Sequence, residues 1–146
     1  MKIEGVGHVV LKVRDLERAA RFYRDILGLK EAARFANRMV FFSAGRNHHD
    51  LAVLSVGPEA PDAPREAVGL YHVALKIGNS LDELRAAKAH LEAHGVTIQG
   101  ISDHRVSQSI YLQDPDGNGL ELFVDADPTI WQADPSAVAT VKPLAL

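Results

Sequence analysis

Residues 5–13 read Gly-Val-Gly-His-Val-Val-Leu-Lys-Val, and residues 69–77 read Gly-Leu-Tyr-His-Val-Ala-Leu-Lys-Ile. The two stretches share a histidine, the apolar run after it and a lysine at matching positions. A repeat of this length outweighs any local signal and predicts a chain built from two similar modules. Alternation of apolar and polar residues predicts a strand in each stretch, with His8 or His72 in its middle. Two such modules facing each other would bring the two imidazoles together.

The same succession of elements follows each predicted first strand. Helical spacing predicts helices over residues 16–27 and 81–91, ended by Gly28 and Gly95. Three short strands are then expected in each half, at 29–35, 38–44 and 49–56, and at 96–101, 106–113 and 119–124. The order strand, helix, strand, strand, strand therefore occurs twice, which indicates an α+β fold.

A proline-rich, acidic stretch without periodicity separates the two halves. We expect module one at 1–57, a linker at 58–68 and module two at 69–126, all within a single domain, 1–126. Residues 127–146 are interrupted by prolines and show no sustained period. They are expected to form a C-terminal tail that packs over the modules or over a neighbouring subunit.

Composition excludes several classes of function. The 16 basic and 19 acidic residues are dispersed, which argues against a nucleic-acid or acidic-lipid partner. The chain has no cysteine, so any metal has to be held by histidine and carboxylate. No apolar run approaches the roughly 20 residues of a membrane span, and no signal peptide is visible, so we expect a cytoplasmic protein.

Glu121 lies among apolar neighbours in the last predicted strand, Gly-Leu-Glu-Leu-Phe-Val at 119–124. Burying a carboxylate without a partner is costly, whereas a divalent cation would keep it ionised. With His8 and His72 it would form a facial triad of two imidazoles and one carboxylate, which leaves coordination positions open for substrate and for dioxygen or water. The plainer alternative has both histidines in the core and Glu121 at a solvent-facing sheet edge.

The modules and the sequence Asp-Pro-Asp-Gly-Asn-Gly-Leu-Glu-Leu at 114–122 resemble the vicinal oxygen chelate superfamily over residues 3–125. That superfamily includes glyoxalase I, fosfomycin-modifying transferases, methylmalonyl-CoA epimerase, metal-free bleomycin-binding proteins and extradiol catechol dioxygenases. The resemblance implies two tandem βαβββ modules that form a cupped, barrel-like mixed sheet around a metal site. It also implies that His8, His72 and Glu121 bind the metal. Fold alone does not choose the reaction.

Three further residues resemble the set found in type I extradiol dioxygenases: His49, His104 and Tyr111. By that resemblance His49 would interact with dioxygen and act as acid or base. His104 and Tyr111 would hydrogen-bond the substrate oxygens. Phe41, Phe123 and Trp131 are expected to line an apolar pocket. Each of the three has a plain alternative as a loop or strand residue, and His90 and His94 are interpreted as a partly exposed helix face.

These features predict an extradiol-type ring-cleaving dioxygenase acting on a small catecholic compound and dioxygen. Fe(II) is the expected metal and Mn(II) the second choice. A homodimer is expected, with the site either within one chain or shared. Glyoxalase I is disfavoured because that family has a second carboxylate or amide ligand in the last strand of its first module, where residues 51–54 here read Leu-Ala-Val-Leu. A fosfomycin-type thiol transferase and a non-catalytic protein that binds an aromatic ligand remain alternatives.

Overall fold

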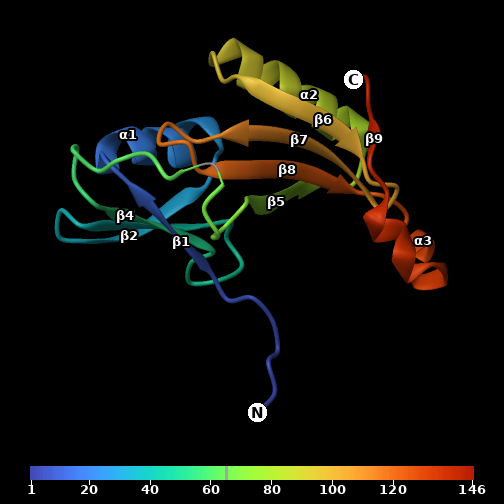
Figure 1. The fold of residues 1–146 in the computed structure, drawn as a ribbon, viewed down its shortest axis with the longest axis horizontal. Coiled ribbons are helices and arrows are strands. Elements are labelled where there is room, and N and C mark those ends of the chain that lie inside the picture. The colour runs from blue at the N-terminus through green and yellow to red at the C-terminus, as the bar shows by residue number, and fades with distance from the viewer. Residues whose placement is uncertain (65) are drawn as a thin grey trace. The chain divides into compact units, whose positions relative to one another are not determined.

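The computed structural model describes residues 1–64 and 66–146 (Figure 1). Its first half contains β1 (Val9–Val13), α1 (Leu16–Ala20), the π-helical turn η1 (Arg21–Ile26), β2 (Lys30–Phe35), β3 (Met39–Ser43) and β4 (Leu51–Ser55). Its second half contains β5 (Val73–Gly78), α2 (Leu81–Ala93), β6 (Ile98–Asp103), β7 (Ser107–Gln113) and β8 (Gly119–Asp125). The tail adds α3 (Thr129–Ala133), the 3-10 turn η2 (Pro135–Ala139) and β9 (Lys142–Pro143).

The chain divides into two compact units. Unit 1 comprises Met1–Val68 together with Asp114–Asn118, and unit 2 comprises Gly69–Gln113 and Gly119–Leu146. Unit 1 contains a four-stranded sheet in the order β1-β4-β3-β2, in which only β1 and β4 are parallel. Unit 2 contains a five-stranded sheet in the order β5-β8-β7-β6-β9, in which only β5 and β8 are parallel. The repeat in the sequence therefore becomes a repeat of strand order.

The helix of unit 1 begins at Asp15, whose carboxylate accepts the backbone N–H groups of Glu17 and Arg18. After Ala20 it widens into a π-helical turn, closed by a hydrogen bond from the Leu27 N–H to the Phe22 carbonyl. Tyr23 of this turn is fully buried with the core residues Val40, Phe42, Leu51 and Val53. The helix is thus fixed to the sheet by its wide turn.

The Asp-Pro-Asp-Gly-Asn turn packs within unit 1. The Tyr23 hydroxyl donates to the buried carboxylate of Asp114 over 2.8 Å, and burial raises the pKa of Tyr23 above its usual value. Arg14 and Arg18 both reach Asp116, at 3.3 and 2.7 Å. Gly117 has φ +86°, which glycine adopts readily. The most specific motif of the sequence therefore has a structural role in unit 1.

In unit 2, α2 runs along one face of the sheet (Figure 1) and buries Leu84 and Leu91. A reciprocal cap begins this helix: Ser80 accepts the Glu83 N–H, and the Glu83 carboxylate accepts from the Ser80 hydroxyl. The tail is part of the same unit. Its strand β9 pairs antiparallel with β6, so the tail extends the sheet at its β6 edge.

The α+β fold from two βαβββ modules is confirmed. Both sheets are mixed, cupped and open, and neither is a closed barrel in the part of the chain that the structure describes. One prediction is wrong in detail: His8 and His72 do not lie in the middle of strands. Each stands immediately before its strand, since pairing in unit 1 begins where the Val9 N–H meets the Asp50 carbonyl.

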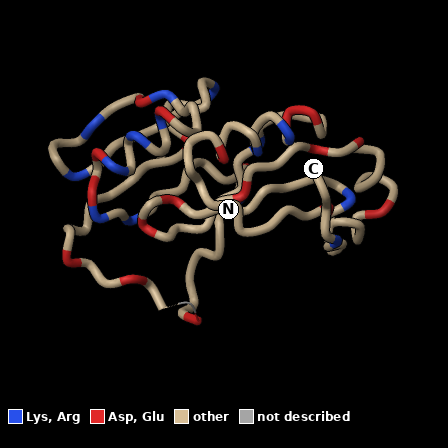
Figure 2. The backbone as a smooth tube through the Cα atoms, turned by 90° about the horizontal axis from the view of Figure 1, so that it is seen from above, with Lys and Arg blue, Asp and Glu red and all other residues tan. Residues whose placement is uncertain are grey.

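Charge is dispersed along the chain, with acidic and basic residues interspersed on the backbone trace (Figure 2). Over residues 1–64 and 66–146, no helix is long and apolar enough to cross a membrane.

Candidate metal centre

His72 and Glu121 are in direct contact in unit 2. The His72 Nε2 atom lies 2.9 Å from a carboxylate oxygen of Glu121. The sheet register explains this contact, because Ala74 of β5 pairs with Glu121 of β8. His72 precedes Ala74 by two residues, so both side chains lie on the face that carries Glu121. Glu121 is buried, with 8% of its surface exposed, and a buried carboxylate needs such a partner.

Ser109 holds the other oxygen of this carboxylate. Its hydroxyl donates to Glu121 over 2.5 Å, and the residue is fully buried. Sequence reasoning missed Ser109. The signal was available in the strand alternation, because Ser109 stands two residues before Tyr111 and therefore shares its face. Hydrogen bonds of this kind orient carboxylates that ligate metals.

Tyr111 and His104 form the next part of the same network. Tyr111 is the direct cross-strand partner of Glu121, and its ring centroid lies 5.7 Å from that of His72. Its hydroxyl lies 2.6 Å from Nε2 of His104. Burial, and after it the charge of Glu121, raises the pKa of Tyr111. At neutral pH the phenol is therefore protonated and can donate a hydrogen bond.

The histidines of unit 1 form a separate cluster. The rings of His8 and His49 have centroids 4.3 Å apart, and the Nδ1 atoms of His48 and His49 are 2.6 Å apart. Phe41 meets His49 edge-on at 5.3 Å. Desolvation, followed by the nearby His8 and His48, lowers the pKa of His49. A neutral imidazole of this kind is able to accept a proton.

The structure thus brings the predicted residues together in two groups. His72, Glu121, Tyr111 and His104 are connected in unit 2, and His8 and His49 are in contact in unit 1. Within residues 1–64 and 66–146, no three His, Asp or Glu side chains are arranged to hold a metal ion. The donors present nevertheless suit one, since His72 and Glu121 supply an imidazole and a held carboxylate, the ligand types of divalent iron, manganese and zinc.

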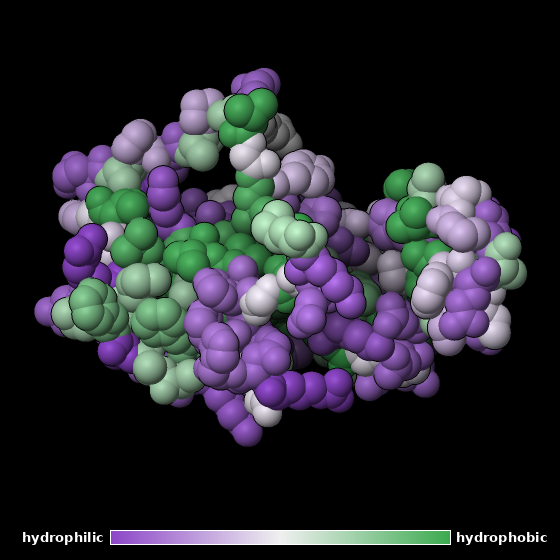
Figure 3. Space-filling view, turned by 90° about the horizontal axis from the view of Figure 1, so that it is seen from below, coloured by the Kyte–Doolittle hydropathy of each residue, from purple (hydrophilic) through white to green (hydrophobic). Residues whose placement is uncertain are grey.

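The residues expected to line a pocket differ in exposure. Phe41 and Phe123 are half-buried, and Phe123 pairs with Ser109 on the face that carries Glu121. Trp131 of α3 is exposed over 52% of its surface. Hydrophobic side chains reach the surface on the face shown in Figure 3. Large apolar residues with high exposure include two that precede the first strands of the modules, Val6 and Tyr71.

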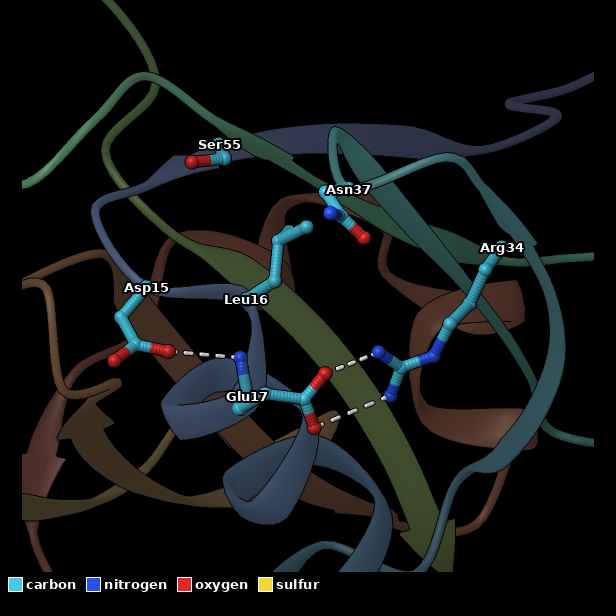
Figure 4. A pocket seen from close by; sticks show the side chains of 6 residues that line it. All are labelled: Asp15, Leu16, Glu17, Arg34, Asn37 and Ser55. Carbon is cyan, nitrogen blue, oxygen red and sulfur yellow. Dashed lines mark hydrogen bonds and ion pairs between the residues drawn. The ribbon is translucent and has the colours of Figure 1, made fainter.

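Two other features are separate from this chemistry. A pocket in unit 1 is lined by Asp15, Leu16, Glu17, Arg34, Asn37 and Ser55 (Figure 4). It contains none of the predicted site residues, and its charged groups Arg34 and Glu17 pair with each other. His90 of α2 and His94, the residue that caps its C-terminus, have tilted rings with centroids 4.3 Å apart, and both are exposed.

The fold and the donor set together define a class: α+β proteins of two βαβββ modules with a histidine before the first strand of each and a carboxylate on the last. The chain belongs to the Glyoxalase/Bleomycin resistance protein/Dioxygenase superfamily, whose sequence model matches residues 5–122.

Similar proteins span more than one activity. The catechol-2,3-dioxygenase of Bacillus subtilis (strain 168) is 36% identical over 130 residues, or 88% of this chain and 44% of that protein. Glutathione transferase FosA of Serratia marcescens is 31% identical over 125 residues, which cover 84% and 82%. A crystal structure of a glyoxalase/dioxygenase from Nostoc punctiforme has a TM-score of 0.71 at 22% identity, covering 85% and 92%, and that likeness supports the fold alone. This chain therefore spans less than half of the dioxygenase that it resembles.

Proposed function

We propose that the protein is an extradiol-type ring-cleaving dioxygenase acting on a small catecholic compound. The observation that carries this proposal is the hydrogen bond between His104 and Tyr111. Tyr111 lies directly across the sheet from Glu121, which in turn contacts His72. A metal triad alone would suit several reactions of the superfamily. The additional phenol, oriented by the imidazole, is suited to hydrogen-bond an oxygen of a diol, and the catechol-2,3-dioxygenase relative points in the same direction.

The proposed metal ligands are His8, His72 and Glu121. His72 and Glu121 are paired in unit 2, and His8 is the third proposed ligand. Fe(II) is the first choice and Mn(II) the second, since histidine and carboxylate ligands accept both. Fe(II) would supply an electrophilic centre for the diol oxygens and one-electron chemistry toward dioxygen.

The chain's own residues have distinct proposed roles. Tyr111 and His104 orient the substrate oxygens through their hydrogen bond, and Ser109 holds the Glu121 carboxylate in one orientation. His49, neutral at working pH, takes and returns a proton during turnover. In the overall reaction the ring bond beside the diol breaks and both atoms of dioxygen enter the product, so no external reductant is needed.

The similar proteins support a second candidate function. Because a glutathione transferase is 31% identical over 82% of its own length, a thiol transfer on the same metal triad is the leading alternative. It gives no reason for the His104–Tyr111 pair. A protein that only binds an aromatic ligand gives no reason for the pair between His72 and the buried Glu121.

The deciding experiment measures metal content together with oxygen uptake. Protein purified without oxygen is reconstituted with Fe(II) or Mn(II), and each form is given a panel of simple catechols. We expect a yellow ring-fission product with one dioxygen consumed per catechol. Bound metal without oxygen uptake would instead favour transfer or lyase chemistry, and failure to bind either metal would favour a binding protein. Light scattering during size-exclusion chromatography tests the expected homodimer.

A further inference from the structure

We propose that the C-terminal tail is a positioning element for the site, because the Thr140 carbonyl fixes which nitrogen of His104 carries the proton. The inference rests on the proposed function and deepens it, since it assigns a role to a segment outside the repeat. The tail joins unit 2 through α3, η2 and β9. Its contacts converge on the turn that carries His104.

The assignment of the proton follows from hydrogen-bonding chemistry. A carbonyl oxygen can only accept, and Nδ1 of His104 lies 2.9 Å from the Thr140 carbonyl. Nδ1 must therefore carry a hydrogen. In a neutral imidazole the other nitrogen is then an acceptor, so Nε2 receives the Tyr111 hydroxyl proton over 2.6 Å. The Tyr111 oxygen keeps its acceptor lone pairs when it donates this proton, so it can accept a hydrogen bond from a substrate hydroxyl.

The tail is held on both sides of Thr140. After it, Lys142 pairs with Asp103 in the β6–β9 ladder, and the Leu144 N–H donates to the Ile101 carbonyl over 3.2 Å. Before it, Asp134 forms an ion pair of 3.1 Å with Arg105. His104 is therefore enclosed between two attachments of the same tail, which limits the movement of the Thr140 carbonyl.

Arg105 adds an argument from backbone strain. It has φ +67°, a region that residues with a side chain rarely adopt, and the Val106 N–H donates to the His104 carbonyl over 2.7 Å across it. Glycine would suit this turn better. Arginine offers what glycine cannot, a guanidinium that reaches Asp134 of the tail. Strain of this kind persists where the surrounding structure imposes it, often beside a functional site.

The test is a chain that ends at Ala139 and so lacks Thr140 and β9. The readout is the tautomer of His104 at neutral pH, from long-range proton–nitrogen correlation spectra of the metal-free protein, with the resonance assigned by His104→Asn. The full chain should show hydrogen on Nδ1, and the shortened chain should move toward hydrogen on Nε2. The matched control removes only residues 145 and 146, beyond the Leu144 hydrogen bond, and should match the full chain.

A double-mutant cycle on kcat distinguishes a positioning role of the tail from a general loss of structure. In the metal-loaded protein the shortened chain should lose about 10- to 100-fold in kcat with a catechol, the usual range for groups that orient others. The same truncation in a His104→Asn background should cost little, because its effect passes through His104. Arg105→Gln keeps every residue of the tail but removes the ion pair, and it should shift the tautomer in the same direction by a smaller amount.

The outcomes distinguish the two proposals. If His104 keeps hydrogen on Nδ1 in both the shortened chain and Arg105→Gln, the tail does not position the ring and the inference is overturned. If the tautomer shifts as expected while the full chain consumes no oxygen with any catechol, the tail's role stands and the dioxygenase proposal fails.

Discussion

The two modules share a strand order but differ at the position that matters most for chemistry. In β4 of the first module Ala52 pairs with Val10, and in β8 of the second Glu121 pairs with Ala74. Val10 and Ala74 each stand two residues after a module's histidine, so Ala52 and Glu121 occupy equivalent places. The repeat therefore preserves the scaffold and supplies only one carboxylate.

The neighbouring strands differ in the same way. Phe41 pairs with Ala52 as Tyr111 pairs with Glu121, and Met39 stands where Ser109 stands. The first module thus has apolar residues at three positions where the second has polar ones. Besides His8, the imidazoles of the first module come from the segment before β4, which carries His48 and His49. The corresponding segment before β8 is the Asp114–Asn118 turn that packs in unit 1.

Removing Glu121, the carboxylate that the second module has and the first lacks, should have the largest effect on metal binding. Glu121→Ala gives the second module the residue of the first, and we expect loss of bound metal because a proposed ligand is gone. Metal analysis after dialysis against Fe(II) or Mn(II) measures this. Asp125→Ala, at the end of the same strand, is the control and should retain metal. Metal retained by Glu121→Ala would exclude Glu121 as a ligand.

Replacing His49 of the first module should reduce turnover without loss of bound metal. His49→Ala is expected to retain metal and to lose about 10²- to 10⁴-fold in kcat, the usual contribution of a general acid or base. Steady-state oxygen uptake and metal analysis on the same samples test both parts. The control is His94→Ala at the exposed C-cap of α2. A variant with unchanged kcat would remove His49 from the proposed chemistry.

Ser109→Ala gives the second module a small apolar residue where the first has Met39. The Glu121 carboxylate then loses the hydrogen bond that orients it, so metal should bind about 10- to 100-fold more weakly. Competition with a metal-sensitive dye measures the dissociation constant. Ser107→Ala, on the same strand, should bind metal like the parent chain. Equal affinity in the two variants would mean that Ser109 does not support the ligand.

Tyr23→Phe tests the contact by which the turn before β8 packs in unit 1. The change removes the donor to the buried Asp114 carboxylate, which should lower the free energy of unfolding by about 1.5–3 kcal/mol. Urea denaturation followed by circular dichroism gives the value. Tyr71→Phe, at an exposed tyrosine, is the control. A change as small as that of Tyr71→Phe would show that the turn is held by other contacts.

The smallest expected effect concerns how the two modules cap their helices. Hydrogen bonds from the Arg18 and Glu17 backbone lower the pKa of Asp15, so its cap stabilises the fold above the unfolded-state value of about 3.9 and is lost as the pH falls through the lower folded-state value. Asp15→Ser keeps a cap that does not titrate. Its unfolding midpoint in urea should therefore depend less on pH between about 4 and 2 than that of the parent chain, and an unchanged dependence on pH would show that the Asp15 cap does not contribute.

Much of the fold could be predicted from the sequence because the repeat appears twice and each copy supports the other. The strands and helices follow from alternation and helical spacing, and their order is as expected. The late start of β1 and β5 could not be predicted, because it depends on where a partner strand offers its first carbonyl. The tail gave no periodic signal, since its short helical turns are held by contacts with β6 and the turn after it.

The candidate site was predictable in its residues but not in its connections. A carboxylate in an apolar strand indicates a buried partner, and His72 is that partner in the structure. The hydrogen bond between His104 and Tyr111 joins the β6–β7 turn to β7, and its geometry depends on the conformation of that turn. The role of Ser109 was not predicted because serine is an ordinary strand residue. The role of Thr140 could not be predicted because the group that contacts His104 is a backbone carbonyl, which no pattern of side chains reveals.

The docking of the Asp114–Asn118 turn in unit 1 has a consequence for how the protein is made. As the chain leaves the ribosome, residues 1–68 emerge long before the aspartates that receive Tyr23, Arg14 and Arg18. Until then a buried hydroxyl and two cations lack their acceptors in that turn, and contacts so distant along the chain form slowly. The first half can therefore reach its final state only after most of the second has been synthesised, which ties the maturation of the two halves together.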